Sequence, residues 1–185
     1  MTTPPEVYTA SASSFPPSTD VVREPLVNWR ICLLCYAVLL VLGAGGGTLL
    51  HILHLVPPAN LPQAEFPQFV IAATLVAPVL ETFLFFYLPY HFLKKLISSP
   101  RIVWGLSFLT TAFLFVICHH GGSHLHRNWL MASHVGLTGT LCFMGCFYLT
   151  TQSGRGSPFW STALCHLFYN STLVFVFCLS FWLGN

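Results

Sequence analysis

The chain has 185 residues, of which 55% are hydrophobic and 6% are charged, and its formal net charge is +2. A soluble domain carries about 25% charged residues, so this composition excludes an ordinary water-exposed surface. The small net charge gives no indication of nucleic-acid binding, and the length allows one domain with a short tail.

The first 28 residues are polar and rich in Pro, Ser and Thr. They contain no apolar stretch of the kind that a cleavable signal peptide needs. Residues 1–28 are therefore predicted to form a disordered cytoplasmic tail. The transmembrane domain is expected to occupy residues 29–185.

Five apolar stretches follow, and each approaches the ~20 residues that a helix needs to cross a bilayer. The predicted spans are residues 31–55, 69–93, 102–119, 129–150 and 159–183. Backbone polar groups in lipid must be satisfied within the segment, so all five are expected to be helices. The predicted fold class is an all-α, polytopic transmembrane bundle.

Small residues in two of the spans predict close contacts between helices. Small-xxx-small spacing occurs at Gly43 and Gly47, and again at Ala132, Gly136 and Thr140. Gly45 and Gly46 extend the first run, and we expect the helix to bend or loosen there.

Lysine and arginine placement predicts the orientation. Cytoplasmic loops carry an excess of basic residues. Six of the seven basic residues fall on one predicted side, and Arg127 alone falls on the other. The six are Arg23, Arg30, Lys94, Lys95, Arg101 and Arg155. This distribution predicts a cytoplasmic N-terminus and an external C-terminus, as an odd number of spans requires.

Glu81 is the one acidic residue inside a predicted span. An ionisable residue there costs roughly 2.5–3.5 kcal/mol on insertion scales, so it is a candidate functional residue. The alternative is a Glu that is protonated or bonded to a neighbouring helix. His166 and Asn170 lie four apart in the fifth span and share one face, which Thr162 extends. His119 closes the third span.

These residue types suit peptide hydrolysis without a covalent intermediate. A carboxylate and an imidazole can deprotonate one water molecule, and a second imidazole with an amide can stabilise an oxyanion. The sequence has neither GxSxG nor HExxH, so it indicates neither a serine hydrolase nor a zinc peptidase, and no cofactor is expected.

Three short motifs in these spans carry a family resemblance. Residues 77–81, APVLE, resemble the opening of a first motif that usually reads Glu-Glu-x-x-x-Arg. Residues 115–119 fit Phe-x-x-x-His, and residues 166–170 fit His-x-x-x-Asn. Over about residues 69–177 the chain resembles the CAAX-protease and bacteriocin-processing family of intramembrane peptidases.

The resemblance implies that Glu81 and His119 activate water and that His166 and Asn170 stabilise the oxyanion. It implies a glutamic-type endopeptidase in lipid that cleaves near the end of a small peptide or membrane-anchored protein. Metal dependence is an older proposal for the family. Eukaryotic members cut prenylated CAAX proteins, whereas the short chain favours a bacterial inner-membrane member.

The first motif departs from the usual pattern, because Thr82 replaces the second Glu and Phe86 replaces the Arg. Losing one partner of a buried ion pair costs roughly 3–5 kcal/mol, whereas replacing both can be nearly neutral. We infer that an apolar contact has replaced a supporting ion pair. The change also keeps open a second reading, a catalytically silent relative that binds membrane peptides.

Two further points stay open in the sequence. His119, His120, His124 and His126 form a dense run at a membrane edge, which favours a metal-binding alternative. His119 is also predicted near the outer end of its span, whereas His166 is about seven residues, or ~10 Å, from the cytoplasmic end. Helix tilt, or a later start of the third helix, would reconcile their depths. The remaining histidines, His51, His54, His91 and His134, are expected at the membrane interfaces.

Overall fold

A computed structural model describes residues 25–56, 66–121 and 128–183 of the chain. Within these ranges the regular structure is helical throughout, and no strand occurs. Five helices are long and apolar enough to cross a membrane. The predicted all-α bundle of five spans is confirmed, whereas nearly all of the predicted tail lies outside the described residues.

Two of the spans are interrupted by π-helical segments, and the other three are continuous. The first span contains α1 (Trp29–Leu39), η1 (Leu40–Gly45) and α2 (Gly46–Ile52). The second helix contains α3 (Phe66–Ile71), η3 (Ala72–Val76), α4 (Ala77–Glu81), η4 (Thr82–Tyr87) and α5 (Leu88–Leu96). The continuous helices are α6 (Pro100–Gly121), α7 (Trp129–Ser153) and α8 (Pro158–Leu183).

Local sequence sets the helix ends. Pro100 and Pro158 open α6 and α8, where a missing N–H costs no helical bond. Asn28 caps α1 by accepting from the N–H of Ile31 at 3.3 Å. Asn128 caps α7 in the same way. The α7 helix ends at Gly154, whose φ of 64° suits glycine.

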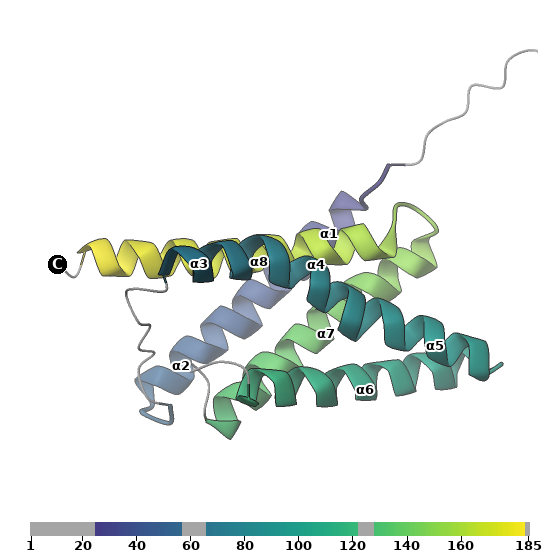
Figure 1. Cartoon of the computed structure of the whole chain (residues 1–185), viewed down its shortest axis with the longest axis horizontal. Helices are drawn as coiled ribbons and strands as arrows, with labels where there is room; N and C mark the ends of the chain where they lie inside the picture. The colour runs from purple at the N-terminus through teal and green to yellow at the C-terminus, as the bar shows by residue number, and fades with distance from the viewer. Residues whose placement is uncertain (1–24, 57–65, 122–127, 184–185) are drawn as a thin grey trace, which may run out of the picture.

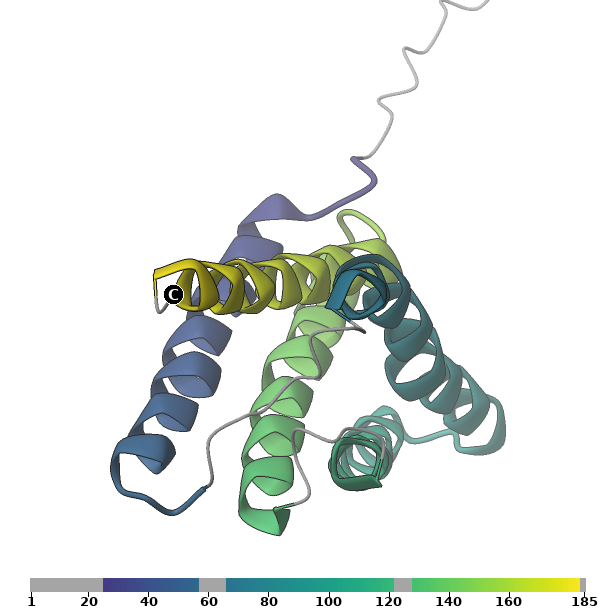
Figure 2. The ribbon, with the colours of Figure 1, turned by 60° about the vertical axis from the view of Figure 1, so that its left-hand side comes forward.

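The central helix of the bundle is α7, which packs against α1, α6 and α8. In Figure 1, α1 and α7 run obliquely to α6 and α8. Figure 2 shows α7 between α1 and α6, with α8 lying across them. The second helix, which carries η3, α4 and η4, packs on α8 and α6.

Two helices approach closely at the predicted small residues. A Cβ on Gly136 would lie 2.8 Å from the backbone of Val116, so α7 and α6 nearly touch there. Ala132 and Thr140, one turn to either side, are fully buried. The predicted close contact is therefore confirmed at this position of α7.

The π-helical segments end at a glycine or shortly before a proline. The first confirms the predicted loosening, since η1 ends at Gly45. Those in the second helix were not predicted. In η3 the N–H of Ala77 bonds to the oxygen of Ala72, five residues back. The next residue, Pro78, has no N–H, so it cannot continue this hydrogen-bond pattern. The η4 segment ends in the same way, two residues before Pro89.

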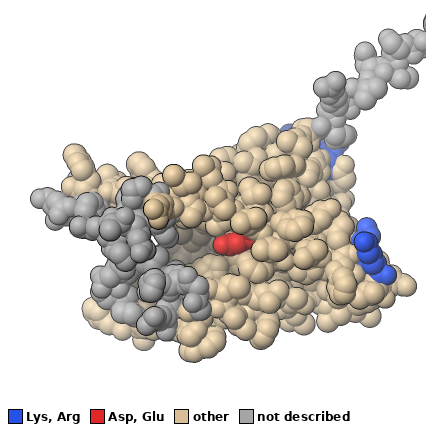
Figure 3. Space-filling model, in the orientation of Figure 1, with Lys and Arg blue, Asp and Glu red and all other residues tan. Residues whose placement is uncertain are grey.

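The described basic residues gather at one end of the bundle. The start of α1, the α5–α6 turn and the α7–α8 turn share that end. They carry Arg30, Lys94, Lys95, Arg101 and Arg155, which are all the basic residues in the described ranges. Figure 3 shows basic side chains at this end of the molecule. Arg23 and Arg127 lie outside the described residues.

Candidate active site

Glu81 ends α4, near the middle of the second span. Its side chain is 27% exposed, and it is the only acidic residue in the described ranges. Figure 3 shows acidic colour at one place, beside a hollow in the surface. One carboxylate oxygen, Oε2, is buried and has no hydrogen-bond partner in the structure. A buried carboxylate oxygen of this kind is energetically costly unless a ligand or water satisfies it.

His166 on α8 lies close to that oxygen. Its Nε2 lies 3.7 Å from Glu81 Oε2, and only 4% of its side chain is exposed. The separation is too long for a direct hydrogen bond and suits one bridging water. The imidazole stacks on Phe143 with ring centroids 4.1 Å apart. This stacking fixes the ring plane beside the carboxylate.

His119 approaches the same place from the end of α6. Its Nδ1 lies 2.8 Å from the carbonyl oxygen of Phe115. A carbonyl only accepts, so Nδ1 is the donor, and in the neutral ring the lone pair is on Nε2. The Phe115 ring lies 4.5 Å from the His119 ring and 6.2 Å from the His166 ring.

The shared contact with Phe115 brings the two histidines together despite their different predicted depths. The α6 helix begins at Pro100, two residues before the predicted start. A later start of the third helix is therefore wrong as an explanation. Helix tilt, the other explanation, stays a prediction.

Asn170 lies one turn after His166 on α8. Its amide nitrogen donates to the carbonyl oxygen of Ala73 at 2.9 Å. That nitrogen carries two hydrogens, so one remains for another acceptor. The structure therefore brings the predicted Asn170 to the second helix, with half of its donor capacity already used there.

Thr82 and Phe86, which replace the expected Glu and Arg, are both fully buried. The Phe86 ring packs edge-on against Phe115 at 5.7 Å and Phe143 at 5.8 Å. These are the two rings that contact the imidazoles. An aromatic cluster thus stands at the position of the expected Arg, whereas the buried Thr82 hydroxyl at the position of the expected Glu has no hydrogen-bond partner in the structure.

The sequence reasoning missed several buried polar residues, and Thr111 is the one that bonds to the second helix. Thr111 on α6 is fully buried, and its hydroxyl donates to the carbonyl oxygen of Phe85. The signal was present, because Ser107, Thr111, Phe115 and His119 recur every four residues and share one face. The fifth span shows the same spacing at Thr162, His166 and Asn170.

The histidine run does not form a metal site in the described part of the chain. His120 stacks on Trp129 with ring centroids 3.7 Å apart. His124 and His126 lie outside the described residues. Within the described ranges, no three His, Cys, Asp or Glu side chains are arranged to hold a metal ion. His134 contacts the first span through the carbonyl oxygen of Gly43.

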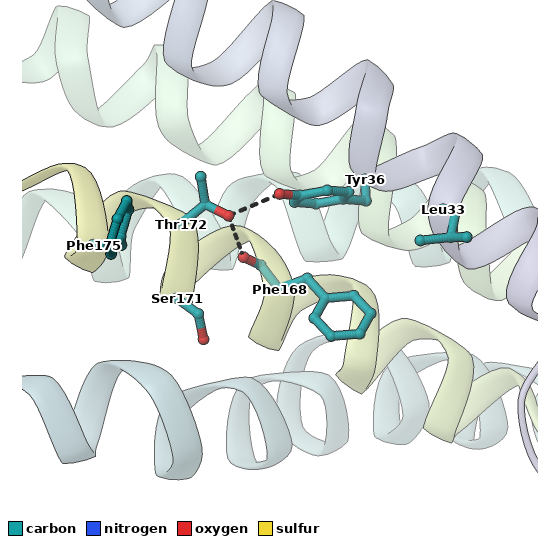
Figure 4. Close-up of a pocket in the computed structure, with 6 residues that line it drawn as sticks. All are labelled: Leu33, Tyr36, Phe168, Ser171, Thr172 and Phe175. Atoms are coloured by element: carbon teal, nitrogen blue, oxygen red, sulfur yellow. Dashed lines mark hydrogen bonds between the residues drawn. The ribbon is translucent and has the colours of Figure 1, made fainter.

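A surface groove of about 400 Å³ lies elsewhere, between α1 and α8 (Figure 4). Its lining residues are Leu33, Tyr36, Phe168, Ser171, Thr172 and Phe175. The Tyr36 and Thr172 hydroxyls are hydrogen-bonded at 2.7 Å. The groove includes none of the four candidate residues, so α8 presents different faces to α1 and to the second helix.

Comparison with known proteins gives one match. Residues 63–172 match the family model described as type II CAAX prenyl endopeptidase Rce1-like. This stretch is more than half of the chain and contains all four candidate residues. Neither the curated proteins nor the solved structures gave a match.

Proposed function

Because the chain belongs to the type II CAAX prenyl endopeptidase Rce1-like family, we propose that it cleaves a peptide bond near the end of a membrane-anchored or small peptide substrate. Family membership and five apolar helices make it a multi-pass membrane protein of a CAAX-protease family. The finer assignment, to a glutamic-type reaction, rests on Glu81, His119, His166 and Asn170.

The observation that carries the proposal is the approach of Glu81 and His166. A carboxylate oxygen with no hydrogen-bond partner lies 3.7 Å from an imidazole nitrogen inside the bundle. One water molecule held between them would satisfy the oxygen. The Glu81 side chain is partly exposed beside the hollow in Figure 3, although Oε2 itself is buried.

In the proposed reaction the Glu81 carboxylate removes a proton from this water as the water oxygen attacks the scissile carbonyl carbon. His119, whose ring shares the contact with Phe115 that His166 makes, is proposed to orient the water. When the C–N bond breaks, the proton held by Glu81 passes to the leaving nitrogen. Water is thus added across the bond, and Glu81 returns to its starting form.

The attacked carbonyl oxygen becomes negatively charged and needs hydrogen-bond donors. His166 and the second N–H of Asn170 are proposed to supply them. Phe115, Phe143 and Phe86 surround the His166 side of the site and keep bulk water away. In such a low-dielectric setting, fixed donors stabilise an oxyanion more strongly than they would in water.

We place the N-terminus in the cytoplasm, because the described basic residues gather at the end of the bundle where α1 begins. A bacterial inner membrane remains the proposed location. A catalytically silent relative is the second candidate, and the replacement of the expected Glu and Arg by Thr82 and Phe86 is the observation that favours it.

The test uses the full chain in lipid vesicles with membrane-anchored peptides, prenylated and unprenylated at a C-terminal Cys. Glu81→Gln keeps the size of the side chain and removes the base, so turnover should fall about 10²- to 10⁴-fold. Glu6→Gln makes the same change in the N-terminal segment and should leave turnover unchanged. Equal turnover by wild type and Glu81→Gln, or no cleavage by either, would overturn the peptidase proposal.

A further inference from the structure

Each of the three described π-helical segments accepts one hydrogen bond from a side chain of another helix. His134 on α7 lies 3.0 Å from the carbonyl oxygen of Gly43 in η1. Asn170 on α8 donates to Ala73 in η3, and Thr111 on α6 donates to Phe85 in η4. Three different helices therefore each hold one π-helical segment.

The carbonyls in the second helix need such donors because prolines remove their usual ones. The oxygen of Ala73 would accept from residue 77 in an α-helix or from residue 78 in a π-helix. Ala77 bonds to Ala72 instead, and Pro78 has no N–H. Phe85 loses its α-helical donor in the same way, because Pro89 is four residues later. In a membrane these freed carbonyls must be satisfied by protein groups.

Glu81 lies between these two hydrogen bonds. It ends the five-residue α4 helix, with η3 before it and η4 after it. Asn170 ties η3 to α8, the helix of His166, and Thr111 ties η4 to α6, the helix of His119. The Glu81 segment is thus fixed on both sides to the helices that carry its proposed partners.

We propose that Thr111 is a positioning residue for Glu81, an inference that rests on the proposed function of that carboxylate. Thr111 contacts no substrate in this scheme. Its hydroxyl holds the Phe85 carbonyl and so sets the rotation of the helix four residues after Glu81. Without the hydroxyl, that carbonyl lies buried and without its α-helical donor, and the segment turns to satisfy it. The carboxylate then moves away from His166.

The first test compares the turnover of three variants. Thr111→Val keeps the shape of the side chain and removes the donor, and we expect kcat to fall about 10- to 100-fold, since a displacement of about 1 Å costs that much. KM should stay within about twofold. Thr111→Ser keeps the hydroxyl and should recover most of the activity. Thr110→Val is the matched control, because Thr110 is exposed on the neighbouring position of α6.

Turnover is expressed per folded protein, with folding measured by thermal denaturation in detergent. The positioning role fails if Thr111→Val keeps wild-type kcat. It also fails if Thr111→Ser is as impaired as Thr111→Val, or if the loss appears in KM alone.

The second test measures geometry without activity. Glu81→Cys and His166→Cys are combined in a Cys118→Ser background and treated with a short bifunctional thiol reagent. Cross-linking should be efficient with Thr111 or with Thr111→Ser and at least several-fold lower with Thr111→Val. Equal yields refute the positioning role. If the chain with Glu81 and His166 intact cleaves nothing, a lower cross-linking yield with Thr111→Val would instead refute the proposed function and retain the positioning role.

Discussion

Gly139 on α7 offers a sharp test of the aromatic support beneath the two histidines. It is buried and faces Phe115. A Cβ added there would lie 2.7 Å from Cε1 and 3.3 Å from Cδ1 of that ring. The perturbation is Gly139→Ala, which adds one methyl group at a known place.

The magnitude follows from this geometry. Carbon atoms in favourable contact are about 3.5–4.0 Å apart, so the ring edge of Phe115 must move by about 1 Å. Overpacking of this size costs roughly 1–3 kcal/mol of stability. The same ring contacts His119 and His166, so its displacement reaches the proposed site. A displacement of about 1 Å there lowers turnover by about 10²-fold.

The assay measures kcat on a membrane-anchored peptide and the midpoint of thermal unfolding in detergent. Gly145→Ala is the matched control, because it lies on the same helix and a Cβ there meets nothing within 4 Å. Alanine favours a helix by about 1 kcal/mol over glycine, so the control should be neutral or slightly more stable. The reasoning is refuted if Gly139→Ala matches Gly145→Ala in both measurements.

Two other sets of substitutions test the altered first motif and the metal-binding alternative. Thr82→Glu places an unpaired carboxyl in the core and should lower stability by about 3–5 kcal/mol, and adding Phe86→Arg should recover part of the loss in thermal denaturation. Equal losses in the single and double variants would contradict the inferred exchange of an ion pair. Replacing His124 and His126 together by Ala should leave both turnover and bound-metal content unchanged. If the variant that lacks His124 and His126 loses activity while Glu81→Gln remains active, the metal-binding alternative is favoured instead.

The five spans could be predicted because membrane crossing imposes a length and an apolar composition that the sequence displays directly. The predicted start of the third span, residue 102, differs from Pro100 by two positions. The π-helical segments of the second helix were missed, although Pro78 and Pro89 were visible inside the apolar run. A proline shows that a donor is lost, but the sequence does not show which carbonyl is freed or what satisfies it.

The site shows a similar division. Polar residues in apolar spans identified Glu81, His119, His166 and Asn170 as candidates, because such residues are costly in lipid. Their mutual placement depends on how the helices cross, which a single sequence does not encode locally. The hydrogen bond from Asn170 to Ala73 depends on a π-helical register as well. The catalytic role of Asn170 therefore stays a prediction.

The π-helical segments also bear on which insertions and deletions evolution can accept in this chain. A π-turn accommodates one residue more than the α-turns around it. Removing one residue from Thr82–Tyr87 would restore regular α-helical turns, and Leu88–Leu96 would keep nearly the same face toward the bundle, because the π-turn holds the extra residue. Removing one residue from within the uninterrupted α6 or α8 would instead turn every later residue of that helix by about 100°. A buried side chain such as that of Phe115 on α6 could then leave the core. A single deletion should accordingly be tolerated better in η4 than within α6 or α8.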